Sequence, residues 1–96
     1  MKTSKSITAE NQWSTKFELL GDALASTKPA RALICATSDA STVTLRRYAS
    51  DGTTVIASLD LDSVMTDVSV PVTGTYDVGV ATGNYGSTPL VITVEQ

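Results

Sequence analysis

The chain has 96 residues and a mass of 10.0 kDa, which is enough for one domain with a single hydrophobic core. Hydrophobic residues make up 42% of it and charged residues 18%, which excludes a disordered chain, and its apolar runs are too short to span a membrane. The chain has no histidine and one cysteine. This excludes His-based acid–base catalysis, the usual zinc ligand sets and a disulfide within the chain.

The formal net charge is −3, with a pI near 4.6. A nucleic-acid-binding domain needs a clustered excess of lysine and arginine, so this balance argues against that class of partner. All seven basic residues nevertheless precede position 48, and six of the ten acidic residues follow it. This asymmetry fits either solvated sheet edges or a polar molecule whose two faces meet neighbouring copies, or a coat, head to tail.

The first twelve residues lack periodicity, which predicts a flexible arm (1–12) ahead of a folded domain (13–96). The basic start of the arm leads into no apolar run of signal-peptide length, so we expect no export by the general secretory route. From Trp13 onward apolar and polar residues alternate. The alternation predicts a half-buried strand whose inner face carries Trp13, Thr15, Phe17 and Leu19.

The next segment, 21–29, contains both glycine and proline and predicts a loop, although its alanines also allow a single helical turn. A short apolar strand is expected over 30–36, in which Cys35 serves as a small core residue. Residues 37–41 have the composition of a turn. Residues 43–48 predict the following strand, with Val43, Leu45 and the stem of Arg47 on its inner face.

A hairpin turn is expected at 50–53, because Asp-Gly tolerates the positive φ of tight hairpins. The return strand, 54–61, should pair with 43–48, and its alternation turns Val55, Ala57, Leu59 and Leu61 inward. Three more strands are expected at 68–72, 76–82 and 90–94, with Pro71 at an edge or strand end because it cannot donate to a ladder. About seven short strands without a convincing helix predict a single antiparallel β-sandwich.

Few residues suggest chemistry. Asp60 and Asp62 share a strand face and could form a weak Ca²⁺ site with Asp67, but solvent-facing aspartates are the simpler interpretation, so we expect no metal. Aromatic rings could form a stacking platform for sugars, whereas the phase of Trp13 and Tyr76 favours the core. Tyr85, in a glycine-rich loop, is the aromatic expected to be partly exposed. No catalytic or cofactor-binding residues are expected, so the chain is predicted not to be an enzyme.

Three ordered segments carry a resemblance to a known group of proteins. They are Ala9–Trp13 (AENQW), the hairpin from Val43 to Thr54 (VTLRR running into DGTT) and Tyr76–Tyr85 (YDVGVATGNY), followed by a final short strand. This order resembles the small β-sandwich proteins of tailed bacteriophage particles, in which NQW, VTLQRS-DGGTTW and YRIGVKTGDY signals recur. The chain departs from that pattern at Val55, where an aromatic is common, and at Asp77 and Ala81, where arginine or lysine is common.

The resemblance implies a structural virion protein assembled in the host cytoplasm. The expected role is a capsid decoration or cement protein on the major coat protein, with a neck or tail component and a carbohydrate-binding adhesion module as alternatives. Many copies or self-association are expected, and no nucleic acid or membrane partner. The candidate coat-docking arm carries Lys2, Lys5 and Lys16, and the candidate exposed surface contacts are Arg46, Arg47 and Tyr85.

Overall fold

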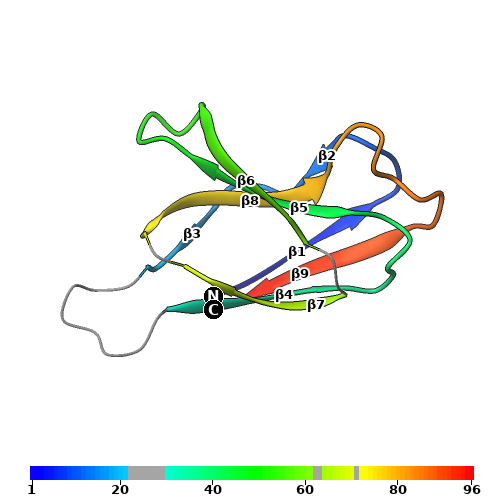
Figure 1. The fold of residues 1–96 in the computed structure, drawn as a ribbon, viewed down its shortest axis with the longest axis horizontal. Helices are drawn as coiled ribbons and strands as arrows, with labels where there is room; N and C mark the ends of the chain where they lie inside the picture. Colours follow the sequence, from blue (N-terminus) through cyan, green and yellow to red (C-terminus); the bar gives the residue numbers. More distant parts are fainter. Residues whose placement is uncertain (22–29, 62–63, 71) are drawn as a thin grey trace.

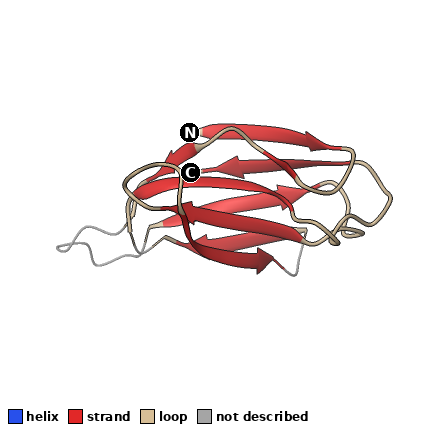
Figure 2. Ribbon diagram, turned by 90° about the horizontal axis from the view of Figure 1, so that it is seen from above, coloured by secondary structure: helices blue, strands red, loops and turns tan. Residues whose placement is uncertain are grey.

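A computed structural model describes residues 1–21, 30–61, 64–70 and 72–96 of the chain. Within these residues the secondary structure is entirely β (Figure 2). The nine strands in the described part are β1 (Lys2–Ile7), β2 (Gln12–Trp13), β3 (Phe17–Leu19), β4 (Arg31–Ala36), β5 (Val43–Tyr48), β6 (Val55–Leu61), β7 (Met65–Ser69), β8 (Gly74–Val80) and β9 (Leu90–Glu95).

The strands form two antiparallel sheets that pack face to face (Figure 1). One sheet has the order β1-β9-β4-β7, and the other has the order β2-β8-β5-β6, with β3 pairing to β8 beyond the end of β2. The predicted antiparallel β-sandwich is therefore confirmed. The predicted loop over 21–29 and the placement of Pro71 fall mostly or wholly outside the described residues.

The core lies between the two sheets and follows the alternation of the sequence. Alternate side chains along each strand point inward, and those between them point to the outer face of the sheet. The fully buried residues include Ile34 of β4, Ile92 and Val94 of β9, and Val78 and Val80 of β8. Strand β8 is buried along most of its length because it lies between β5 on one side and β2 and β3 on the other.

Strand β1 corrects the prediction of a flexible arm. Residues Lys2–Ile7 pair along their whole length with β9, from Lys2 opposite Glu95 to Ile7 opposite Leu90. Ile7 is fully buried in the core. The prediction failed because an edge strand needs apolar residues only where it meets the core, and here that is Ile7, while backbone pairing holds the polar remainder. The sandwich therefore begins at Lys2 and not at Trp13.

A one-residue offset separates β2 from β3. Trp13 lies opposite Gly79, whereas Phe17 lies opposite Tyr76, so four steps along this segment match three along β8. An odd offset of this kind reverses the face to which side chains point. Phe17 packs against the core and Leu19 is buried in it, but Trp13 lies on the outer face. The prediction of a core Trp13 was wrong, and that of a core Tyr76 is confirmed.

The hairpin of β5 and β6 forms as predicted, with Leu45 opposite Leu59 and a bulge at Ile56. Of the residues expected to face inward from β6, only Leu61 is buried. Val55 lies opposite Tyr48 on the outer face, because the bulge at Ile56 reverses its direction. Ala57 and Leu59 face inward as predicted but remain exposed, since alternation does not show whether the second sheet covers that side. Cys35 likewise alternates with the buried Ala32 and Ile34 of β4 and is half-buried, which corrects its placement in the core.

Candidate docking surface

The outer face of the five-stranded sheet carries a buried polar cluster of Asp77, Arg46 and Tyr48 that is covered by Trp13, and we call it the outer cluster. Asp77 of β8 is only 2% exposed. Its carboxylate accepts hydrogen bonds from Arg46 Nε at 2.9 Å, Arg46 Nη2 at 2.7 Å and the Tyr48 hydroxyl at 2.7 Å. Arg46 Nη2 also donates to the Tyr48 hydroxyl at 2.9 Å. The Arg46 guanidinium carbon lies 3.4 Å from the centre of the Trp13 ring, so the indole covers the ion pair.

The geometry of the outer cluster shifts two ionisation equilibria. The hydrogen bond to Asp77 raises the pKa of Arg46 above its usual value against the opposing effect of burial. Burial is the main cause that raises the pKa of Tyr48, and the hydrogen bond to Asp77 adds to it. Gly79 makes room for the cluster, since a Cβ there would lie 2.7 Å from Trp13 Cε3. Arg46 is therefore engaged within the domain.

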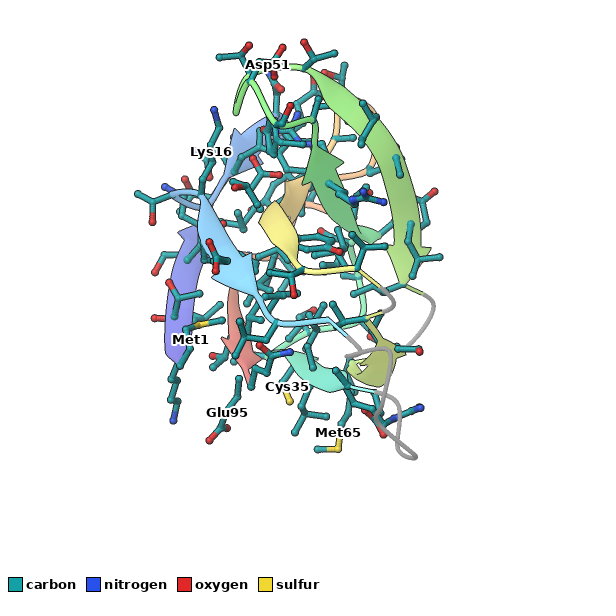
Figure 3. All side chains as sticks on the ribbon, turned by 90° about the vertical axis from the view of Figure 1, so that its left-hand side faces the viewer. Met1, Lys16, Cys35, Asp51, Met65 and Glu95 are labelled. Carbon is teal, nitrogen blue, oxygen red and sulfur yellow. The ribbon has the colours of Figure 1, made fainter. Side chains whose placement is uncertain are left out.

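The three lysines of the predicted docking arm do not form one patch. Lys16 belongs to the outer cluster, because its ammonium donates to the Gly52 carbonyl at 2.5 Å and lies 4.5 Å from the centre of the Tyr48 ring. Lys2 and Lys5 lie on β1, and their odd spacing sends them to opposite faces of that strand. Figure 3 shows Lys16 near the hairpin that carries Asp51.

The remaining candidates are also placed by the fold. Asp60 of β6 accepts a hydrogen bond from the Thr44 hydroxyl at 2.7 Å, and Asp67 of β7 pairs with Arg31 at 2.8 Å in the other sheet. Asp62 lies outside the described residues, among which no group of three or more potential metal ligands occurs. Tyr85 is half-buried and packs against the core. The described part holds no helix that could span a membrane.

Arg47 occupies a different environment from Arg46. Its parity on β5 points it inward, toward a groove of about 190 Å³ where β6 and β7 face each other across the open side of the sandwich. The Nε atom of Arg47 is buried and has no hydrogen-bond partner. The guanidinium forms neither of the two salt bridges found among the described residues. The predicted inward direction of the Arg47 stem is consistent with this position.

Large apolar side chains are also exposed on or next to β6 and β7, but only Leu59 among them lines the groove. Of the nine large hydrophobic residues exposed in the described part, six lie on β6, on β7 or next to β7, with exposed fractions of 40% to 64%. They are Val55, Ile56, Leu59, Val64, Met65 and Val72. In Figure 3, Met65 projects from the lower end of the molecule. We call the groove, with the exposed Leu59 at its edge, the β6–β7 surface.

Sequence reasoning missed the β6–β7 surface because it assigned the apolar residues of β6 to the core. Comparison of the chain with protein-family models, curated proteins and solved structures finds no match.

Proposed function

We propose that this protein is a structural component of a tailed-bacteriophage particle, docked on the major coat protein as a decoration or cement protein of the shell. The observation that supports a docking role is the β6–β7 surface, an open groove of about 190 Å³ lined by the apolar side chains of Leu45, Leu59, Val68, Val70 and Tyr76. Contiguous exposed apolar surface is typical of interaction sites. A small domain also gains stability when a larger body covers such a surface. The motif resemblance described above provides the viral setting.

The docking surface in this proposal differs from the one expected from the sequence. Lys16 is held within the outer cluster, and Lys2 and Lys5 point to opposite faces of β1. A flexible basic arm therefore does not account for docking, and the β6–β7 surface takes its place. The proposed role is non-enzymatic, with the coat protein or another virion protein as partner.

The adhesion module is the less favoured alternative. A sugar-binding platform needs an aromatic ring with a free face. Tyr76 is buried in the core, and Trp13 could offer only the face opposite the Arg46 guanidinium, which lies 3.4 Å from the ring centre. A neck or tail position would use the same β6–β7 surface and differs from shell decoration in copy number.

The test is the copy number of this protein in purified particles, measured by quantitative mass spectrometry against the major coat protein. A simple ratio to coat subunits supports shell decoration. A few copies per particle would instead indicate the neck or tail. Absence from particles would contradict the proposal as a whole. The Leu59→Lys variant should not associate with particles. The Val91→Lys variant, changed at an exposed apolar position on β9, should remain bound.

A further inference from the structure

A second pocket lies at the end of the sandwich where β5 and β8 part. The ladder between these two strands ends with Arg47 opposite Tyr76. From there the chain of β5 continues into its hairpin with β6, away from the start of β8 (Figure 1). The pocket between them has a volume of about 200 Å³, and Arg47, Ser50, Thr73, Gly74 and Thr75 are among its lining residues. We call it the hairpin pocket.

The Arg47 guanidinium lies beside Gly74, on the side of β5 that faces β8. Its Nε atom is 3.8 Å from the position that a Cβ would take on Gly74, so the absent side chain leaves room for the guanidinium. Arg47 forms no hydrogen bond or ion pair with any described residue. Nε is buried, whereas the two Nη atoms are not among the buried unpaired atoms of the described residues and therefore reach solvent. The Nη donors are thus available to a ligand.

The hairpin pocket offers further donors beside the guanidinium. The hydroxyls of Ser50 and Thr75 make no hydrogen bond with a described residue. Thr73 Oγ1 accepts a hydrogen bond from the backbone amide of Gly21 at 2.8 Å, and its own proton remains to be donated. No aspartate or glutamate occurs among the described residues that line the pocket. Its chemistry therefore suits an anion.

The charges around the hairpin pocket are not balanced within the described residues. Neither Arg47 nor Lys16, which lies next to the hairpin, takes part in the two salt bridges found there. The carboxylate of Asp51 accepts hydrogen bonds within its own turn, and that of Asp77 is held in the outer cluster. Glu18 of β3 points to the outer face, because its neighbours along the strand pack inward. Arg47 thus lacks a counter-charge.

We propose that the hairpin pocket binds a phosphate group, with Arg47 as its charged anchor and the hydroxyls of Ser50, Thr73 and Thr75 as additional donors. A guanidinium forms strong, often bidentate hydrogen bonds with phosphate oxygens. A tetrahedral phosphate also presents acceptors in several directions, which suits donors from the hairpin and from the start of β8 together. A planar carboxylate would engage chiefly the guanidinium. The site does not depend on the docking role proposed above.

The test uses the full ¹⁵N-labelled chain, titrated with sodium phosphate and separately with sodium chloride to the same ionic strength. We expect phosphate to shift the backbone amides of 48–50 and 73–75 to a plateau, and chloride to leave them unchanged. Sodium acetate should bind roughly 10-fold more weakly than phosphate, because it leaves hydroxyl donors unused. Tighter binding of methyl phosphate than of inorganic phosphate would identify a phosphate ester as the ligand, and the reverse order would identify free phosphate.

Substitutions assign the binding to the pocket. Arg47→Gln should weaken phosphate binding roughly 10- to 100-fold, as for the loss of a hydrogen bond between charged groups. Arg47→Lys should bind with intermediate affinity, since it keeps the charge and loses the planar fork. Ser50→Ala should weaken binding roughly 2- to 10-fold. The matched control is Arg31→Gln, which removes the same charge from the exposed pair with Asp67 and should leave phosphate binding unchanged.

Four results would overturn the proposal. These are phosphate shifts that do not exceed those of chloride, shifts confined to another surface, unchanged affinity in Arg47→Gln, and acetate binding as tight as phosphate binding. If Arg47→Gln fails to fold, Ser50→Ala decides, because Ser50 is exposed on the hairpin loop and makes no hydrogen bond with a described residue. Unchanged phosphate affinity in that folded variant would then reject the site.

Discussion

Replacement of Asp77 by asparagine should strongly destabilise the domain. The Asp77 carboxylate is 3% exposed as a side chain and pairs with Arg46, whose side chain is 23% exposed. Breaking a buried ion pair by removing one partner costs roughly 3–5 kcal/mol. Partial exposure lets water reach Arg46, so we expect about 3 kcal/mol. For a domain of this size that loss lowers the melting temperature by roughly 12–24 °C.

The assay is guanidinium chloride denaturation followed by the fluorescence of Trp13, the one tryptophan of the chain, whose ring lies on Arg46. The matched control is Asp67→Asn. Asp67 and Arg31 also form a salt bridge, but their side chains are 57% and 47% exposed. Exposed pairs contribute little, so this variant should lose no more than about 1 kcal/mol.

A double-mutant cycle separates the ion pair from other effects of the substitution. Arg46→Met, Asp77→Asn and the double variant should give a coupling energy of roughly 2 kcal/mol, within the range for residues in one network. The reasoning would be refuted by a loss below about 1 kcal/mol for Asp77→Asn, or by a coupling below about 0.5 kcal/mol, the level expected of independent sites.

Three further predictions test other parts of the structure. Gly79→Ala should cost roughly 1–3 kcal/mol in chemical denaturation, because its Cβ would meet the Gln12 carbonyl oxygen of the paired strand and the Trp13 ring. Gly74→Ala in the same strand, with its nearest contacts at 3.8 Å, should cost little, and equal effects would contradict this account. Ile7→Ala should lower the free energy of unfolding by roughly 2–5 kcal/mol, as for other large-to-small changes in protein cores. No loss of stability would instead support the flexible arm over residues 1–12. Hydrogen bonds, chiefly from Thr54, lower the pKa of the Asp51 carboxyl to about 2, which carbon NMR can measure. The stability that these bonds contribute should therefore be lost as the pH falls from about 4 toward 2. A pKa near 4 in the wild type would refute the turn geometry.

Much of the fold could be predicted because period-2 alternation and turn residues are local signals. The pairing of β5 with β6 followed from the Asp-Gly turn between them, and the structure confirms it. The errors have non-local causes. Trp13 changed faces because of one extra residue between β2 and β3, whose position depends on the register with β8. Strand β1 was missed because its backbone pairing with β9 leaves little trace in a polar sequence.

The candidate site was less predictable than the fold. Arg46 and Arg47 are adjacent and look equivalent in the sequence, yet strand pleating sends one to an ion pair on the outer face and the other into the groove. The difference between them depends on Asp77 of β8, 30 positions further along than Arg47. Only the assembled sheet brings that carboxylate to Arg46 and leaves Arg47 without one.

The two sheets are joined unequally along their two long sides. On one side β1 packs against β2 and β8. On the other side the groove separates β6 from β7. We therefore expect the two sheets to move apart more easily at the β6–β7 side than at the β1 side. Backbone amide hydrogens should exchange faster along β6 and β7 than along β8 and β9. A partner bound in the groove should slow the exchange along β6 and β7.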